Sequence, residues 1–185
     1  MKILKAIQFA STKHKGQVRR VSELPYITHP IVVMELVQKY KGSSKHIEEL
    51  KCSALLHDTL EDTDTSYFEL EREFGSMVAS LVLELSSDKE KIKEIGKHPY
   101  IKEKMLGMSQ YALTLKLLDR FSNILDEPGK NYTKKTVELM EYLMNNRKDI
   151  TKRQQMIIGH IVDYINGLSL DVIDAEAKEF KNGRN

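Results

Sequence analysis

Apolar residues recur every three or four positions along almost the whole 185-residue chain. This spacing places them on one face of a helix and is typical of amphipathic α-helices, whereas the strict alternation of a half-buried strand is nearly absent. Nine glycines and four prolines are few, and they stand mainly at the boundaries of the periodic segments. The pattern therefore predicts an all-α protein without internal repeats or low-complexity linkers.

Boundary signals divide this pattern into separate helices. Pro30 suits a first helical position, Ser66 and Glu69 form a capping box, and Ser109 can cap a long helix. Residues 17–28 are expected to form an irregular loop or a short β-hairpin. The predicted helices are 2–14, 30–42, a segment capped by Ser43 or Ser44 that carries Ile47 through Glu61, 66–75, 77–85, pieces of 88–106 broken near Gly96 and Pro99, 109–125, 132–146, 151–166 and 169–180.

The charge balance argues against a nucleic-acid or membrane partner. The 29 basic and 27 acidic side chains leave a net charge of +2, which gives no overall attraction to a polyanion. No segment approaches the roughly 20 apolar residues that span a bilayer, and residues 1–15 lack the apolar run of a signal peptide. Cys52 is the only cysteine, so no intramolecular disulfide can form. We expect one compact domain, residues 1–185, in a reducing cytoplasm.

The segment ALLHDTLEDT, residues 54–63, carries the densest set of reactive side chains. On a helix, His57 lies one turn before Glu61, and Asp58 lies one turn before Asp62. Acidic neighbours at this spacing destabilise an exposed helix by about 0.2–0.5 kcal/mol per pair, and a buried one by more. A bound cation would relieve this repulsion. The alternative is a frayed helix end whose carboxylates simply meet water.

His29 stands in a stiffened stretch of chain. Pro25 restricts the approach and Pro30 fixes the backbone directly after the histidine, so the imidazole can be held in one direction. A lone histidine before a helix is more often a polar cap. The same dipeptide at His98 lacks the stiff approach and an acidic partner, and we interpret it as structural.

Asp119 falls beside the apolar stripe of the helix predicted over 109–125. A carboxylate that points into a core needs a partner. This partner could be Lys116 or Arg120 in an internal salt bridge, or equally well a metal ion. Asn123, on a neighbouring face, offers a donor and an acceptor that suit a ribose or phosphate oxygen, or ordinary surface.

Basic residues crowd the end of the first predicted helix and the following loop. Lys13, Lys15, Arg19 and Arg20 could contact phosphates, and arginine can also stack on a base. A solvated basic surface is the alternative explanation.

Taken together, these segments supply two imidazoles and two carboxylates that could bind one divalent cation: His29, His57, Asp58 and Asp119. The acidic pair Glu61 and Asp62 could then transfer protons for a hydrolytic reaction. The sequence therefore favours a metal-dependent phosphohydrolase.

Four motifs occur in order over about residues 1–125: HKGQVRR at 14–20 with PYITHP at 25–30, ALLHDTLEDT at 54–63, SDK at 87–89, and KLLDRFSN at 116–123. In this order and spacing they resemble the HD-domain hydrolases of the RelA/SpoT type. The resemblance is strongest to the hydrolase-only members, the small alarmone hydrolases that include the metazoan SpoT homologues. It implies an HD-domain helical bundle that removes the 3′-pyrophosphate from ppGpp or pppGpp, giving GDP or GTP and pyrophosphate.

The resemblance also implies a role for each matching residue. One Mn²⁺ ion per chain would be bound by His29, His57, Asp58 and Asp119. Glu61 and Asp62 would handle the attacking water and proton transfer. Arg19 and Arg20 would contact the base and phosphates, and Lys116 and Asn123 would hold the sugar-phosphate.

The chain departs from the family pattern at three positions. Glu23 replaces a usual glycine, Arg20 a usual lysine, and Leu118 a usual alanine that precedes the metal-binding aspartate. Residues 124–150 match poorly, so the tyrosine that lines the family's pocket could be Tyr132 or Tyr142.

These departures leave two other functions open. One is an HD-type phosphohydrolase that acts on another nucleotide, such as an adenine alarmone, NADPH or a nucleoside phosphate. The other is a catalytically silent nucleotide-binding regulator, which is less favoured because no metal ligand and neither acidic residue is lost. The sequence leaves the oligomeric state open, and the last 60 residues could complete the core or form a homo-oligomer surface.

Overall fold

The computed structural model describes residues 2–126 and 128–167, and these residues form a bundle of α-helices without a strand. The prediction of an all-α fold is therefore confirmed. The predicted helix at 169–180 lies outside the described residues. The helices are α1 (Lys2–Lys13), α2 (Thr28–Lys41), α3 (Ile47–Leu56), α4 (Thr59–Asp62), α5 (Tyr67–Phe74), α6 (Ser76–Leu85), α7 (Lys89–Ile95), α8 (Lys97–Gly107), α9 (Gln110–Leu125), α10 (Lys130–Asn146) and α11 (Lys152–Ile165).

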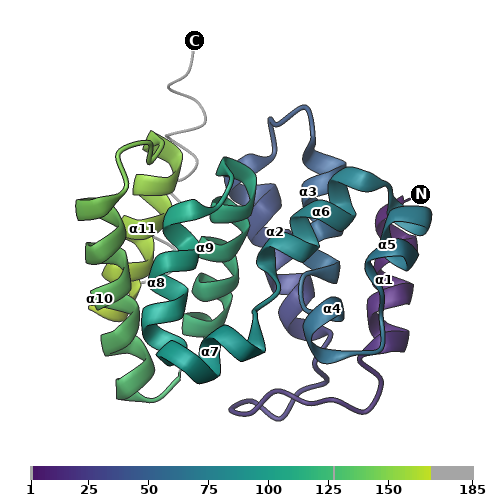
Figure 1. Ribbon diagram of the computed structural model, residues 1–185, viewed down its shortest axis with the longest axis horizontal. Coiled ribbons are helices and arrows are strands. Elements are labelled where there is room, and N and C mark those ends of the chain that lie inside the picture. The colour runs from purple at the N-terminus through teal and green to yellow at the C-terminus, as the bar shows by residue number, and fades with distance from the viewer. Residues whose placement is uncertain (1, 127, 168–185) are drawn as a thin grey trace.

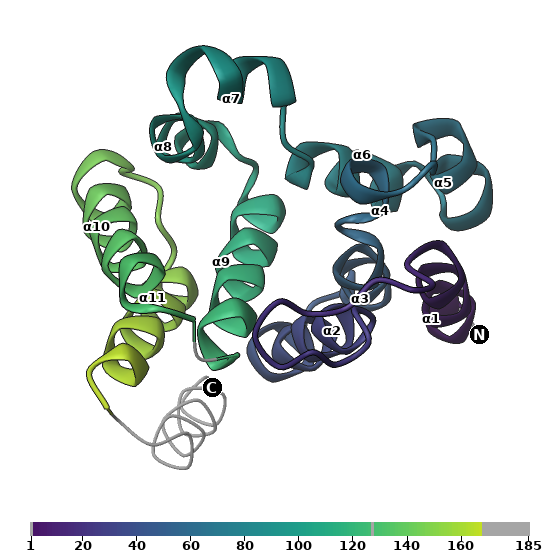
Figure 2. The ribbon, with the colours of Figure 1, turned by 90° about the horizontal axis from the view of Figure 1, so that it is seen from below.

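Helix α9 stands at the centre of the bundle. It packs against α2, α3 and α6 on one side and against α11 on the other, as Figures 1 and 2 show. Its residues are buried on nearly every face, including Leu113, Leu117 and Phe121. A helix that is buried all round belongs to the core. Polar side chains that α9 carries in its middle are therefore held away from bulk water.

The helix predicted to carry Ile47 through Glu61 is divided in two. The ring of His57 donates from its Nδ1 to Ala54 O at 2.7 Å, and the hydroxyl of Thr59 donates to Leu56 O at 2.7 Å. Side chains that bond these carbonyls compete with the backbone ladder of a continuous helix. Consequently α3 ends at Leu56, α4 begins at Thr59, and His57 and Asp58 form the junction.

Several predicted boundaries need correction. Helix α2 begins at Thr28, so His29 and Pro30 both lie in its first turn, where a proline costs no backbone hydrogen bond. Helix α3 begins after His46 and has no side-chain cap, so the prediction of Ser43 or Ser44 as its cap is wrong.

The predicted caps and breaks elsewhere are largely present. Ser109 accepts from Ala112 N, as expected. Ser66 accepts from Glu69 N, but the carboxylate of Glu69 pairs with Lys13 instead of completing the capping box. Gly96 separates α7 from α8 with a φ of 85°, whereas Pro99 lies within the first turn of α8 and breaks nothing.

The loop between α1 and α2 contains a single antiparallel bridge, between Val18 and Pro25, and no strand. Glu23 at its tip adopts a φ of 57°. This left-handed conformation is one that glycine adopts without steric cost. Glu23 thus occupies a backbone conformation that also suits glycine.

No helix within the two described ranges has the length and apolar character of a membrane span.

Arg147 joins the C-terminal helices to the rest of the bundle. Its guanidinium donates to Met105 O at 2.7 Å and to Met108 O at 2.6 Å, and its Nε lies 2.7 Å from Asp149 Oδ1. The residue is 9% exposed. These bonds fix the end of α10 against the connection between α8 and α9.

We predict that Arg147→Ala lowers the free energy of unfolding by about 2–4 kcal/mol, because two buried carbonyls lose their donors. Urea unfolding followed by circular dichroism measures the change. Arg72→Ala is the matched control, since the Arg72 side chain is 70% exposed and pairs only with its neighbour Glu73. This control should change stability by less than about 0.5 kcal/mol. Equal losses in the two variants would contradict the prediction.

Candidate metal centre and active site

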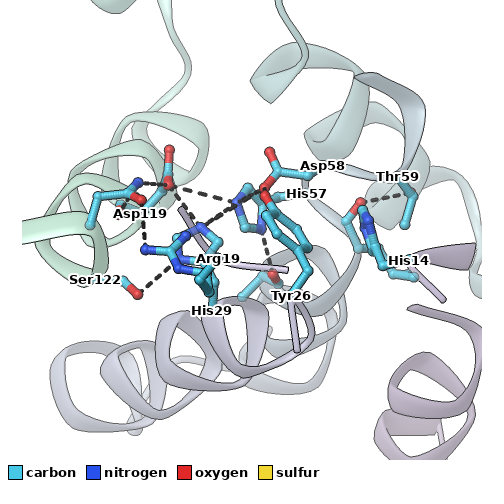
Figure 3. Close-up of polar contacts among 12 residues, drawn as sticks. His14, Arg19, Tyr26, His29, His57, Asp58, Thr59, Asp119 and Ser122 are labelled. Carbon is cyan, nitrogen blue, oxygen red and sulfur yellow. Dashed lines mark hydrogen bonds and ion pairs between the residues drawn. The ribbon is translucent and has the colours of Figure 1, made fainter. Parts of the chain in front are cut away.

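Figure 3 shows His29, His57 and Asp119 turned toward one another from α2, the α3–α4 junction and α9. One ligand atom from each lies within 4.8 Å of the others. His29 Nε2 is 3.2 Å from both His57 Nε2 and Asp119 Oδ1, and His57 Nε2 is 3.7 Å from Asp119 Oδ1. Two ligands bound at about 2.1 Å to one ion lie about 3.0–3.4 Å apart. The spacing therefore fits a single cation with little movement.

Asp58 lies at the edge of this group. Its Oδ2 is 2.9 Å from His57 Nε2 and 3.9 Å from His29 Nε2. The hydroxyl of Tyr26 donates to the same oxygen. The structure thus brings together all four residues that the sequence predicted as metal ligands, from segments up to 90 positions apart.

The two imidazoles are oriented by their other ring nitrogens. His57 Nδ1 lies 2.7 Å from Ala54 O, a carbonyl that only accepts, so Nδ1 carries the proton of a neutral ring. His29 Nδ1 lies 2.9 Å from the hydroxyl of Ser122. Such outer partners fix the ring direction and leave Nε2 as the metal-binding atom.

The carboxylate of Asp119 is held by two side chains of its own helix. Lys116 Nζ lies 2.8 Å from Oδ2, and Asn123 Nδ2 donates to Oδ1 at 2.8 Å. The internal salt bridge considered as an alternative is therefore present. It occupies Oδ2, whereas Oδ1 is the oxygen that faces the two imidazoles, so the ion pair and a metal ligand are compatible.

The charges in this cluster shift the pKa values strongly. Burial alone would lower the pKa of His57, but the carboxylates of Asp58 and Asp119 outweigh it and raise that pKa to about 10. Burial lowers the pKa of His29. Burial opposes the ionisation of both Asp58 and Asp119. The charge of His57 nevertheless holds the pKa of Asp58 below its usual range, and the charge of Lys116 does the same for Asp119. Both carboxylates stay ionised and attract a cation.

The acidic pair lies beside these ligands on α4. Glu61 Oε2 accepts a hydrogen bond of 2.8 Å from Ser87 N, and Lys89 Nζ donates to Glu61 O at 3.0 Å. Partial burial, followed by the charges of Asp58 and Glu61, raises the pKa of Asp62. A raised pKa brings a carboxyl group closer to the range useful for proton transfer.

Comparison with known proteins agrees with this geometry. A family model described as HD domain matches residues 6–111. The chain belongs to the HD-domain family. The matched range ends before Asp119. The structure, and not the family match, shows that Asp119 lies beside His29 and His57.

Relatives of this HD domain carry related names. A protein of Danio rerio named guanosine-3′,5′-bis(diphosphate) 3′-pyrophosphohydrolase MESH1 is 37% identical over 125 residues, which are 67% of this chain and 68% of the relative. An Aquifex aeolicus (strain VF5) protein named guanosine-3′,5′-bis(diphosphate) 3′-pyrophosphohydrolase is 36% identical over an alignment of 153 positions, which covers 74% of this chain and 20% of the longer relative.

A solved structure supports the same relationship. It is described as a metazoan ortholog of SpoT that hydrolyses ppGpp and plays a role in starvation responses. Its TM-score is 0.72 at 25% identity, and the match covers 91% of this chain and 97% of that one. The resemblance drawn from the motifs and the fold predicted from it are therefore confirmed.

The predicted substrate-binding residues occupy different positions around the HD-domain site. Arg19 donates to Asn123 Oδ1 at 3.1 Å and pairs with Asp126 at 3.0 Å, which places it beside α9 (Figure 3). Lys116 and Asn123 contact Asp119, as described above. Arg20 is exposed in the loop before α2. Lys13 pairs with Asp64, so part of the basic surface is structural.

The two candidate tyrosines differ in their surroundings. The ring of Tyr132 lies 5.2 Å from the guanidinium of Arg120, the residue after Asp119. Burial raises the pKa of Tyr132, and the charges that act on it include those of Asp119 and Lys116. Tyr142 instead stacks with Lys102 of α8. Tyr132 is the tyrosine that lies close to the HD-domain site.

Sequence reasoning missed the residues that orient the ligands. Tyr26 stood within the PYITHP motif, but its contact with Asp58 was not predicted. Burial, then the charge of Asp58, raises the pKa of Tyr26, so its hydroxyl remains a donor. Ser122 carries no signal of its own, because its partner His29 is 93 positions away.

We predict that a divalent cation, tested as Mn²⁺, stabilises the folded protein, because the side chains that could bind it come from α2, the α3–α4 junction and α9 and are brought together only by folding. At 100 times its dissociation constant, the ion should add about 2.7 kcal/mol to the free energy of unfolding. Protons compete for His57, whose pKa without metal is about 10, so the affinity should fall as the pH is lowered. Thermal unfolding with Mn²⁺ or a chelator, at two pH values, measures both effects; an unchanged melting temperature would contradict them.

Proposed function

We propose that this protein is a metal-dependent hydrolase that removes the 3′-pyrophosphate from ppGpp or pppGpp, giving GDP or GTP and pyrophosphate. The observation that carries the proposal is the convergence of His29, His57 and Asp119 on one point. Membership of the HD-domain family and the names of its relatives support the substrate.

We propose that the cation is Mn²⁺ and that its ligands are His29, His57, Asp58 and Asp119. Two imidazole nitrogens with two carboxylates form a mixed set that suits a borderline first-row ion. The two Nε2 atoms lie 3.2 Å apart and both face Oδ1 of Asp119, and this spacing supports the fit. A divalent cation held there supplies positive charge that polarises a phosphoryl oxygen and makes water more acidic.

Glu61 and Asp62 would divide the proton transfers. The backbone N–H of Ser87 occupies Oε2 of Glu61, which leaves the other oxygen to accept a proton from the attacking water. The raised pKa of Asp62 suits a group that holds a proton and then donates it to the leaving oxygen.

The basic and amide side chains would hold the nucleotide. We propose that Arg19 and Arg20 contact the base and phosphates, and that Lys116 and Asn123 hold the sugar-phosphate. The position of Arg19 within hydrogen-bonding distance of Asn123 supports a shared binding surface. Arginine can form two parallel bonds to a phosphate, which adds orientation to charge attraction.

Two of the three departures from the family pattern, at Glu23 and Leu118, do not favour another nucleotide. Glu23 keeps the left-handed backbone that glycine would adopt, and Leu118 is fully buried in the core. Neither change alters a side chain at the metal centre. The activity test described below still distinguishes the other possibilities. These are turnover of an adenine alarmone, NADPH or a nucleoside phosphate, and binding of a nucleotide without turnover.

We further propose that residues 1–185 act as one domain on a small nucleotide, in the cytoplasm, without a nucleic-acid or membrane partner. The continuous core that joins α9 to helices on both sides supports a single unit. A homo-oligomer is compatible with this proposal.

We predict that purified protein with Mn²⁺ releases pyrophosphate from ppGpp and that a chelator abolishes the release. Enzyme-coupled detection of pyrophosphate measures the rate across a panel of ppGpp, pppGpp, an adenine alarmone, NADPH and GTP. A higher kcat/KM for another nucleotide would reassign the substrate. Tight ppGpp binding by calorimetry without turnover would instead indicate a regulator, and absence of turnover with every divalent metal would remove the hydrolase proposal.

We predict that Asp119→Asn and Glu61→Gln separate metal binding from catalysis. Asp119→Asn should lose bound metal and activity together, because it removes an anionic ligand. Glu61→Gln should retain one metal per chain while kcat falls by about 10²–10⁴-fold, because it removes a proton acceptor. Metal analysis and steady-state kinetics on the same samples measure both quantities. Full activity in both variants would contradict the assigned roles.

A further inference from the structure

The connection between α6 and α7, residues 86–88, touches Glu61 on one side and α8 on the other. On the first side, Ser87 N donates to Glu61 Oε2 at 2.8 Å. On the second side, Asp88 N donates to the hydroxyl of Tyr100 at 2.7 Å, and Lys104 Nζ donates to Ser86 O. This connection therefore joins a side chain of the acidic pair to two side chains of α8.

The backbone of this connection explains why its bonds point in opposite directions. Ser86 has φ −68° and ψ 139°, and Asp88 has φ −82° and ψ 106°, so the chain is extended. Successive N–H groups of extended chain face opposite sides. When Asp88 N is fixed to Tyr100, Ser87 N is consequently directed at Glu61.

The hydroxyl of Tyr100 is the central group on the α8 side. Tyr100 is 5% exposed, and its oxygen also accepts from Lys104 Nζ at 3.3 Å. A cavity of about 560 Å³, lined by Glu84, Asp88, Lys91, Tyr100, Glu103, Lys104, Gly107 and Met108, opens beside this contact. On the side that faces α8, hydrogen bonds from Asp88 N and Lys104 therefore fix the connection at the edge of this cavity.

We propose that Tyr100 is a positioning residue for Glu61 and acts through the backbone of Ser87, which links Asp88 N to Ser87 N. The proposal rests on the role given to Glu61 in the proposed function. Tyr100 holds Asp88 N, this fixes the direction of Ser87 N, and Ser87 N holds one carboxylate oxygen of Glu61. The other oxygen then stays directed toward the place of the attacking water.

Tyr100→Phe tests this proposal with the smallest change, since it removes the hydroxyl and keeps the buried ring. Tyr67→Phe is the matched control. Its hydroxyl lies 3.3 Å from Ser80 Oγ and joins α5 to α6. Urea unfolding of both variants reports any general loss of stability.

The first measurement is amide hydrogen exchange at Ser87 in the metal-loaded full-length chain, which needs no turnover. Exchange should become about tenfold faster in Tyr100→Phe, because the N–H group loses its fixed direction, and should stay unchanged in Tyr67→Phe. Unchanged exchange in Tyr100→Phe would overturn the proposal, whatever the substrate of the protein proves to be.

The second measurement is steady-state pyrophosphate release. Tyr100→Phe should lower kcat by about tenfold while KM and bound metal stay within about twofold, because misplacement of a reacting group acts on the chemical step. In a Glu61→Gln background the same substitution should have little further effect. Additive losses would show that Tyr100 acts independently of Glu61 and would overturn the proposal. Failure of the wild-type protein to cleave any nucleotide would refute the proposed function, while the exchange measurement would still decide the role of Tyr100.

Discussion

The close approach of two imidazoles and two carboxylates, three of them buried and that of Asp58 partly buried, is the constraint around which this bundle is organised. Buried polar groups are costly unless each has a partner. Here each ligand side chain has one, and the four partners come from different parts of the chain: the carbonyl of Ala54 for His57, the hydroxyl of Ser122 for His29, the hydroxyl of Tyr26 for Asp58, and the ammonium of Lys116 for Asp119. These bonds direct the ligands at one point while helix packing excludes water.

The fold class and the side chains that cluster at the candidate site were predictable because both leave local signals. Helical periodicity marks each amphipathic segment, and the motifs around His29, His57 and Asp119 mark the reactive side chains. The division between α3 and α4 was not predictable from periodicity. His57 and Thr59 bond to backbone carbonyls one turn earlier, and these local bonds end α3 although the apolar stripe continues.

The contacts that orient the side chains of the site could not be predicted from the sequence, for a different reason. The bond between Ser87 and Glu61 spans 26 positions, and the bond between Arg19 and Asn123 spans 104. Neither residue of such a pair alters the local pattern of its segment, so sequence spacing carries no sign of them. A serine that orients a histidine and a serine on the surface look the same until the fold brings the partner close.

The central position of α9 separates the machinery into two parts that can change independently. The clustered histidines and carboxylates and the acidic pair lie on α9 and the segments before it, whereas Tyr132 of α10 contacts Arg120 of α9. The family match ends at residue 111, so α10 lies outside the matched range. Substitutions in α10 can therefore change the surroundings of Arg120 while the clustered histidines and carboxylates, which lie on other segments, stay the same.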